Sequence, residues 1–211
     1  IYKKNCGSFG DISTFSFYAN KQITTGEGGM ITTNNQKLYE RSKNFRNLCF
    51  GKRDRFNHTD IGWNYRMTNI QASLGVSQLK RIKSIVEKRH KVGKEYFKKL
   101  KANKNIYIPE TSRDYAKNIY WVIALVIMNK NLKIDAKKLM KKLMAYGIQT
   151  RPFFWPMHKQ EVFKNKYKIN ISGNFKNSEY ISKYGLYLPS SLDIKSSQIK
   201  FICEKVNSIL K

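Results

Sequence analysis

Acidic side chains are scarce in this 211-residue sequence, in which 14 Asp and Glu stand against 41 Lys and Arg and the formal net charge is +27. Such an excess of positive charge is typical of proteins that neutralise nucleic-acid phosphates. The basic residues are 32 Lys and only 9 Arg, scattered along the chain, whereas base readout and bidentate phosphate contacts favour Arg. No helix-turn-helix, zinc-finger or RNP-type pattern is present. We therefore predict no specific nucleic-acid binding and a solvated basic surface that attracts small anions.

Cysteines and long apolar runs are also few. Cys6, Cys49 and Cys203 are far apart, odd in number and not at metal-ligand spacing, which predicts reduced thiols and excludes a disulfide framework. The longest apolar run, Tyr120–Met128, is too short to span a bilayer, and nothing resembles a secretory signal. We expect a soluble, cytoplasmic protein with no membrane partner. Because the first residue is Ile1 rather than Met, we also expect that the chain begins inside a larger gene product.

The first part of the chain is predicted to form a β-hairpin from Asp11 to Thr33. On opposite faces of the first strand, Ile12, Thr14 and Ser16 alternate with Ser13, Phe15 and Phe17, and Met30–Thr33 supplies a second short strand. Between them, Thr24–Gly29 contains three glycines in four positions, which permit unusual backbone angles and a close approach of ligand or backbone. A helix over Gln36–Asn47 and a polar loop over residues 51–64 follow.

A long helix is the clearest element in the sequence. Thr68 and Gln71 form a capping-box pattern at its start, and glycines 75 and 93 are places where it would bend. The apolar helical pattern gives way to a polar stretch at Lys101–Lys104, which predicts a boundary between two structural units. The apolar residues that follow the helical spacing are Ile70, Leu74, Leu79, Ile82, Val86, Tyr96, Phe97 and Leu100.

The remainder alternates predicted strands and helices, which indicates an α/β or α+β subdomain. An aromatic and proline-containing loop over residues 152–158 interrupts the alternation. The expected strands cover residues 106–108, 120–128 and 148–150, and the expected helices cover residues 135–146, closed by Gly147, 178–184 and 196–210.

Lys21 is a candidate nucleophile because it comes just after an apolar strand and faces the glycine-rich turn. A fixed position and partial desolvation favour the neutral amine that forms an imine. From the residues alone, a lysine that points into water at the end of a strand is the more common alternative.

Three blocks of sequence resemble the sugar aminotransferases often called the DegT family, within the fold type I pyridoxal-phosphate enzymes. The first block is Gly10–Lys21 with Thr24–Gly29, the second is Gly62–Ala72, and the third is Gly147–Phe154 with Pro156–His158. They fall in the family's order and cover essentially the whole chain. The resemblance implies the C-terminal part of a fold type I transferase, with residues 1–101 as the end of the large, cofactor-binding domain with its long connecting helix and residues 102–211 as a small C-terminal α/β domain.

The resemblance also implies roles for residues of the first two blocks. Lys21 would carry pyridoxal 5'-phosphate as an imine and then act as general acid and base. Ser16 would contact the cofactor phosphate, although a strand serine bonded to the backbone is the alternative. Asn64 would reach the phosphate of the neighbouring subunit's cofactor, so that a homodimer shares its active sites, although it could equally be a turn residue. Arg66 is interpreted as a structural ion-pair partner.

The third block would line the nucleotide-sugar side of the cleft. Arg151, Phe154 and His158 are its candidate substrate-binding residues. His158 could bond a diphosphate oxygen or have no role in binding, and Glu27, close to Lys21, could cap the backbone or contact substrate.

The reaction implied by the resemblance is a two-stage transamination. Glutamate gives its amino group to the cofactor, and the aminated cofactor passes it to a 4-keto-6-deoxy nucleotide sugar. The block around Lys21 most resembles the branch that makes perosamine from a GDP-linked 4-keto-6-deoxymannose, and a UDP- or dTDP-linked keto sugar is the alternative. A related branch that carries out dehydration has histidine in place of the lysine, so Lys21 favours amino transfer. The expected role is synthesis of an amino sugar for a surface polysaccharide such as O-antigen.

One part of the family pattern is missing. Family members carry, before the lysine, an acid bound to the pyridine nitrogen, an aromatic ring stacked on the cofactor and phosphate-binding backbone groups. Asp11 is the only acid before Lys21, and it lies too near Lys21 in the sequence to be that partner. A non-catalytic fragment of such an enzyme is therefore the alternative to an active aminotransferase.

Overall fold

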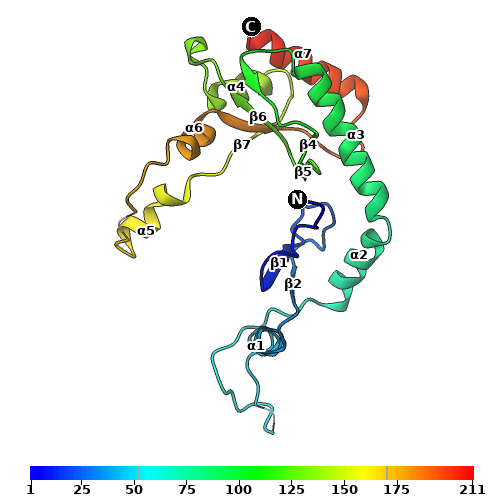
Figure 1. Cartoon of the computed structure of the whole chain (residues 1–211), viewed down its shortest axis with the longest axis vertical. Coiled ribbons are helices and arrows are strands. Elements are labelled where there is room, and N and C mark those ends of the chain that lie inside the picture. Colours follow the sequence, from blue (N-terminus) through cyan, green and yellow to red (C-terminus); the bar gives the residue numbers. More distant parts are fainter. Residues whose placement is uncertain (52, 170) are drawn as a thin grey trace. The chain divides into compact units, whose positions relative to one another are not determined.

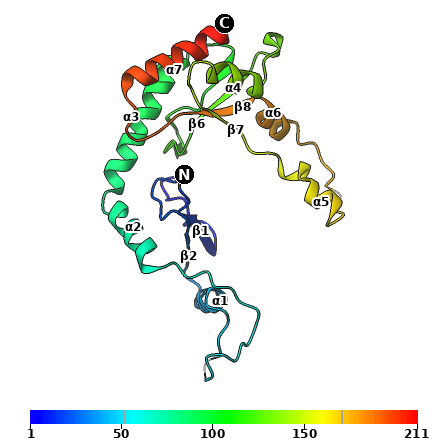
Figure 2. The ribbon, with the colours of Figure 1, turned by 180° about the vertical axis from the view of Figure 1, so that it is seen from behind.

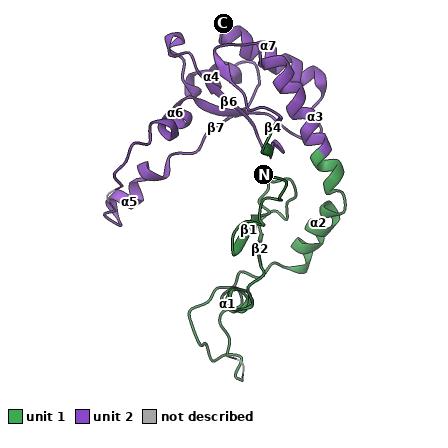
Figure 3. Cartoon of the chain, viewed as in Figure 1, with its two compact units in different colours: residues 1–86, 114–116 green, residues 87–113, 117–211 purple. Residues whose placement is uncertain are grey.

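The computed structural model describes residues 1–51, 53–169 and 171–211. It divides into two compact units, residues 1–86 with 114–116 and residues 87–113 with 117–211 (Figure 3). The division falls inside helix α3 (Ile82–Leu100), whereas the sequence places a boundary after Lys101. The difference arises because Tyr96 and Leu100 of α3 are fully buried in the core of the second unit.

The first unit contains the predicted hairpin and the predicted first helix. Strands β1 (Ile12–Ser16) and β2 (Gly29–Thr33) pair antiparallel along their whole length (Figure 1). Helix α1 (Gln36–Arg46) starts at Asn35, whose side-chain oxygen accepts hydrogen bonds from the first turn of the helix at 2.9 and 3.2 Å. An Asn at this position satisfies backbone N–H groups that the helix itself leaves unpaired. Both predictions are confirmed.

The predicted single helix is two helices. Its capping box is confirmed, because Thr68 and Gln71 bond each other's backbone N–H groups at the start of α2 (Asn69–Leu79). The prediction of a bend at Gly75 or Gly93 is wrong, because the break lies at Lys80 and Arg81, between α2 and α3. The two glycines instead make room for neighbours. A Cβ atom at Gly75 would lie 3.0 Å from Cγ2 of Thr25, and one at Gly93 would overlap the ring of Tyr120.

The second unit is built on a four-stranded antiparallel sheet in the order β3-β6-β8-β7. Figure 2 labels three of these strands, β6, β8 and β7. Alternate residues of the two central strands, β6 (Ile123–Ile127) and β8 (Gly185–Leu188), are buried in one core cluster. The cluster also takes side chains from α3, α4 (Ala136–Met144) and α7 (Ser196–Ile209). The alternate apolar residues of the strands and the apolar faces of the helices therefore pack together in one core layer. The outer strands are β3 (Ile106–Tyr107) and β7 (Arg151–Pro152).

All predicted elements of this unit but one are confirmed with shifted bounds. The strand expected over residues 148–150 forms instead at Arg151 and Pro152. Strand β8 was not predicted, because it follows helix α6 (Lys176–Tyr184) directly, and the glycine at the junction, Gly185, is itself the first residue of the strand. The remaining elements are β4 (Ser112–Arg113), β5 (Ala116–Lys117), the 3₁₀ helices η1 (Lys130–Leu132) and η2 (Met157–Lys159), and α5 (Glu161–Asn165).

Polar contacts fix α3 and α7 to the rest of the second unit. The Tyr96 hydroxyl donates to the carbonyl of Pro189 at 2.8 Å, and burial raises the pKa of this hydroxyl far above its usual range, so it remains a donor. Asn105 Nδ2 donates to the carbonyl of Leu210 at 2.9 Å. These bonds satisfy carbonyl groups at the ends of β8 and α7 that secondary structure leaves unpaired.

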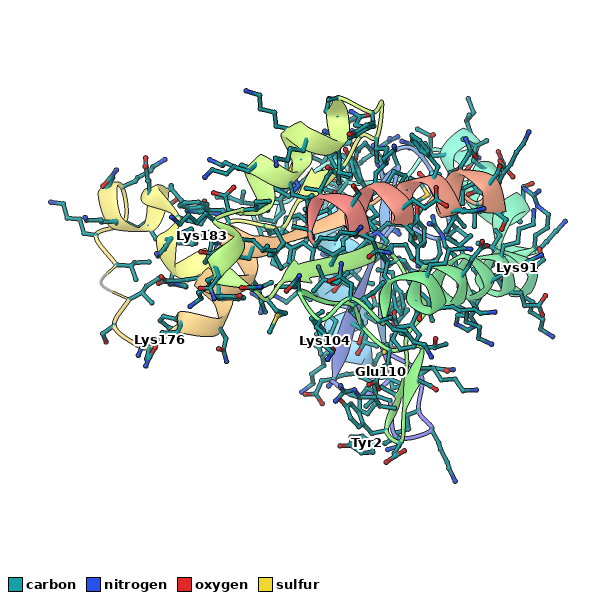
Figure 4. The ribbon with its side chains drawn as sticks, turned by 90° about the horizontal axis from the view of Figure 1, so that it is seen from above. Tyr2, Lys91, Lys104, Glu110, Lys176 and Lys183 are labelled. Atoms are coloured by element: carbon teal, nitrogen blue, oxygen red, sulfur yellow. The ribbon has the colours of Figure 1, made fainter. Side chains whose placement is uncertain are left out.

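The surface carries many lysines, as the composition predicts. Lys91 on α3 and Lys176 on α6 are exposed, and Figure 4 shows their side chains as sticks around the ribbon. Because only 14 acids are present for 41 basic residues, most of these charges are solvated rather than paired. Among the described residues, no helix is long and apolar enough to cross a membrane.

Gly93→Ala tests whether α3 needs a residue without a side chain next to Tyr120. Helix propensity alone would make alanine more stable than glycine by about 1 kcal/mol. Overlap with the buried Tyr120 ring opposes this, since overpacking typically costs about 1–3 kcal/mol. We expect a net loss in the free energy of unfolding, measured by urea denaturation followed by circular dichroism. Lys91→Ala, an exposed change on the same helix, is the control, and a Gly93→Ala chain as stable as this control would contradict the close approach.

Candidate active site

The turn that carries Lys21 is closed by backbone hydrogen bonds. The Phe17 N–H donates to the carbonyl of Gly28 at 2.9 Å, and the Phe17 carbonyl accepts from the Thr25 N–H at 3.0 Å. Within the loop, the Lys21 N–H donates to the carbonyl of Tyr18 at 3.0 Å. The lysine is half-buried. Its Cα is therefore held in a tight turn at the end of β1.

Gly28 is required at the far side of this loop. Its φ is +149°, which side chains rarely adopt, and a Cβ atom there would lie 2.8 Å from Cε of Met67. The Thr25 side chain is buried against the same place, with its hydroxyl donating to the carbonyl of Glu27 at 2.7 Å. The glycine-rich sequence thus allows the loop and the start of α2 to approach closely.

Ser16 lies on the same turn as Lys21. Its Oγ accepts a hydrogen bond from the Tyr18 N–H at 3.3 Å. The Tyr18 carbonyl in turn accepts from the Lys21 N–H, so these two candidate residues are linked through one residue. The Ser16 side chain is exposed, and its hydroxyl has a hydrogen to donate as well as the lone pair already used.

Asn64 lies in a loop that is fixed to the end of α1. The Trp63 N–H donates to the carbonyl of Phe45 at 2.7 Å, and Asn64 forms a β-bridge with Asn47. The Asn64 side chain is exposed, and its Oδ1 accepts from Arg66 Nε at 3.1 Å. Arg66 thus orients the amide, whereas the sequence predicted an ion pair for it.

Arg151 and Phe154 lie in the second unit. Arg151 is on the edge strand β7, pairs with Tyr187 and is exposed. Phe154 is 75% exposed, and its ring is stacked on Trp121 with centroids 6.5 Å apart. Arg151 also lines an open groove of about 830 Å³, with Tyr146, Gly147, Ile148, Gln149, Pro189, Ser191, Asp193, Ile194, Ser197, Gln198, Phe201 and Ile202.

His158 is held by neighbours of its own unit. Its Nε2 lies 3.1 Å from Oε1 of Glu179, and its ring stacks on Phe175 with centroids 4.3 Å apart. Lys159 Nζ lies 2.7 Å from the other carboxylate oxygen of Glu179. Hydrogen bonds from Lys159 and then from His158 lower the pKa of Glu179. The carboxylate therefore fixes the imidazole, a partner that the sequence analysis did not foresee.

The structure groups the candidate residues by unit. Ser16 and Lys21 share one turn and Asn64 belongs to the same unit, while Arg151, Phe154 and His158 follow one another in the other unit. One residue missed from the sequence, Gln78 of α2, bonds the backbone of the Lys21 loop. Its signal was its spacing from Gln71 and Gly75 on one helix face. Within the described residues, no group of His, Cys, Asp and Glu has the arrangement of a metal site.

The residues of the first unit fit two ends of pyridoxal phosphate. Lys21 supplies an amine, Ser16 a hydroxyl, and Asn64 an amide, which are groups suited to an imine bond and to phosphate oxygens. In the part of the chain that is described, the buried Nε2 of Gln22, next to Lys21, has no hydrogen-bond acceptor. Asp11 is at the opposite end of β1 from Ser16, where its carbonyl accepts from the Thr33 hydroxyl at 2.6 Å. Asp11 therefore does not fit the role of the acid that binds the pyridine nitrogen of pyridoxal phosphate.

Comparison with known proteins identifies the family. The family described as the DegT/DnrJ/EryC1/StrS aminotransferase family matches residues 1–207. The chain belongs to this family. Its members are pyridoxal-phosphate-dependent sugar aminotransferases, and the chain has the corresponding mixed α/β fold, as part of a fold type I enzyme.

Individual relatives support the family assignment. The chain is 34% identical to a GDP-perosamine synthase of Escherichia coli O157:H7, over 97% of the chain and 53% of that protein. It is 27% identical to a UDP-4-amino-4,6-dideoxy-N-acetyl-beta-L-altrosamine transaminase of Campylobacter jejuni, over 99% of the chain and 54% of that protein. Its fold matches Helicobacter pylori PseC, an aminotransferase involved in the biosynthesis of pseudoaminic acid, with a TM-score of 0.88 and 26% identity, over 100% of the chain and 56% of that structure. The chain thus spans about half the length of these relatives.

Glu179→Gln tests the carboxylate that holds His158. Because the folded chain lowers the pKa of Glu179 below its ordinary 4.5, this group stabilises the fold above that pH, and the effect is lost as the pH falls through the lowered value. We expect Glu179→Gln to lower the midpoint of urea unfolding modestly at pH 7, with the difference vanishing in acid. Glu161→Gln, an exposed change on α5, is the control. A difference between Glu179→Gln and the parent chain that is constant down to pH 3 would contradict the ion pair.

Proposed function

We propose that the chain carries the cofactor lysine of an aminotransferase that transfers the amino group of glutamate to a GDP-linked 4-keto-6-deoxy sugar, as in perosamine synthesis. The observation that carries this proposal is the 34% identity to a GDP-perosamine synthase over nearly the whole chain. The half-buried Lys21 in its glycine-rich hairpin supports it, because imine chemistry needs an amine in a fixed position. On this proposal, the unit with β1 and β2 belongs to a large domain and the four-stranded unit is the small domain.

Lys21 is the reacting group of this chain. Pyridoxal phosphate, when bound, supplies an electron sink for the substrate electrons. The Lys21 amine holds the cofactor between reactions, and after release it moves a proton to or from the substrate carbon that bears nitrogen. The bond from the Lys21 N–H to the Tyr18 carbonyl limits the movement of its backbone, so the amine returns to the same place.

Ser16 and Asn64 bind phosphate. The Ser16 hydroxyl donates to a phosphate oxygen while its lone pair still accepts from the Tyr18 N–H. Asn64 donates from its amide nitrogen, since its oxygen already accepts from Arg66. The exposure of Asn64 supports a contact with the neighbouring subunit's phosphate in a homodimer.

Arg151 and Phe154 contact the nucleotide sugar. An exposed guanidinium suits diphosphate oxygens, and the exposed face of an aromatic ring suits a base or a sugar. Nε2 of His158 is bonded to Glu179, so only Nδ1 would be left for the substrate, and we assign His158 to holding this loop in place. The product would serve synthesis of a surface polysaccharide.

Two alternatives have support. The identity to a UDP-sugar transaminase of Campylobacter jejuni, at 27%, favours a UDP-linked substrate less strongly than the perosamine synthases favour a GDP-linked one. The match to about half of each relative supports the second alternative, that this chain is a non-catalytic fragment of such an enzyme.

Lys21→Ala tests the proposed nucleophile. The purified chain is mixed with pyridoxal phosphate, its visible spectrum is recorded, and the adduct is reduced with borohydride and mapped by peptide mass spectrometry. We expect one predominant label on Lys21, and no such label in Lys21→Ala. Amino transfer from glutamate to GDP-linked and UDP-linked 4-keto-6-deoxy sugars should then fall by at least about 100-fold, because the acid–base group is lost.

Lys37→Ala, an exposed change on α1, is the matched control and should behave as the parent chain. Equal labelling of many lysines in the parent chain would count against the assignment of Lys21. A clear label on Lys21 with transfer only to the UDP-linked sugar would replace the GDP-linked substrate and leave the nucleophile in place.

A further inference from the structure

Gln78 bonds both backbone groups of one residue in the Lys21 loop. Its Oε1 accepts from the Thr24 N–H at 3.0 Å, and its Nε2 donates to the Thr24 carbonyl at 2.7 Å. The two residues are 54 positions apart in the chain. A side-chain amide that pairs in this way replaces the neighbouring strand that an extended backbone segment would otherwise need.

The Gln78 amide is itself fixed to its helix. Nε2 also donates to the carbonyl of Leu74, one turn earlier in α2, at 2.9 Å. The side chain therefore uses its acceptor once and both of its N–H groups. Because the bonds to Thr24 are partly buried, water competes with them less than it would at an exposed site.

Helix α2 comes close enough for these bonds because Gly75 has no side chain. A Cβ atom at that position would lie 3.0 Å from Cγ2 of Thr25, whose side chain is 3% exposed. On the other side of the loop, the Thr24 hydroxyl donates to the carbonyl of Phe17 at 3.0 Å. Thr24 thus links α2 to the end of β1.

Lys21 lies between two fixed points. The Lys21 N–H donates to the carbonyl of Tyr18, three residues earlier. Thr24, three residues later, is bonded to Gln78. We propose that Gln78 is a positioning residue for Lys21, which fixes the second end of its loop and thereby the place of its amine. This inference rests on the proposed function of Lys21. Gln78 itself touches neither substrate nor cofactor in this role.

Gln78→Met tests the inference, because Met has a similar shape without the hydrogen-bonding groups. Two quantities are measured on the full chain. One is the exchange rate of the Thr24 amide hydrogen, by NMR without cofactor. The other is the rate at which borohydride traps pyridoxal phosphate on Lys21, relative to surface lysines. We expect Thr24 exchange to be at least roughly tenfold faster. We expect the trapping rate at Lys21, relative to surface lysines, to fall roughly 10- to 100-fold.

Gln36→Met, on the exposed face of α1, is the matched control and should change neither quantity. Gln78→Glu is the second variant. It keeps an oxygen for the Thr24 N–H but places a carboxylate against two carbonyl groups, so it should lose trapping at Lys21 as Gln78→Met does.

The outcomes separate this inference from the proposed function. Faster Thr24 exchange with unchanged trapping at Lys21 would overturn the positioning role while Lys21 keeps its own. The same conclusion follows if both Gln78 variants lose their circular dichroism signal, because Gln78 would then act on folding as a whole. If borohydride traps pyridoxal phosphate on Lys21 of the parent chain no faster than on surface lysines, the proposed function is rejected, and the role of Gln78 with it.

Discussion

Burial of apolar side chains is concentrated in the second unit, and this constraint determines how each part of the chain is held together. Leu125, Leu139, Leu186 and Val206 come from two strands and two helices and are all 0% exposed. Each such side chain stabilises the fold by about 1.5–3 kcal/mol relative to leaving it in water. Among the described residues of the first unit, those classed as buried are Thr25, Cys49 and Ile85. Apolar burial therefore defines the sheet unit but contributes little to the hairpin unit.

The hairpin unit is defined instead by directional hydrogen bonds from polar side chains to backbone. Asn35 and Thr68 cap helices, the Thr33 hydroxyl closes the open end of the hairpin, and Gln78 holds Thr24. A typical bond of this kind adds only about 0.5–1.5 kcal/mol, but it fixes direction and distance more narrowly than an apolar contact does. Such a unit is suited to placing an amine at the end of a strand. It is less suited to supplying stability.

The sequence predicted what is local and missed what depends on distant partners. The hairpin and the Thr68 capping box were predictable because their signals lie within a few residues. The apolar residues of the long helix follow a helical spacing, but that spacing does not show that Ile70 is 78% exposed or that Gln78 faces the loop. A glycine within a helical pattern predicts a bend, whereas Gly75 and Gly93 make room for Thr25 and Tyr120. In each case the deciding partner lies many residues away, and the sequence alone does not show it.

The same distinction applies to the candidate site. Lys21 was a candidate from its place after a strand and Ser16 only from the family resemblance, and the structure links the two through Tyr18. Glu179, which holds His158, is 21 residues from it and gave no signal in the sequence. On the proposed function, Lys21 and Ser16 would serve the aldehyde and phosphate ends of pyridoxal phosphate, while Asp11, the one acid before Lys21, lies at the far end of β1. The proposed roles thus concern attachment of the cofactor and binding of its phosphate, and none of them concerns the pyridine nitrogen.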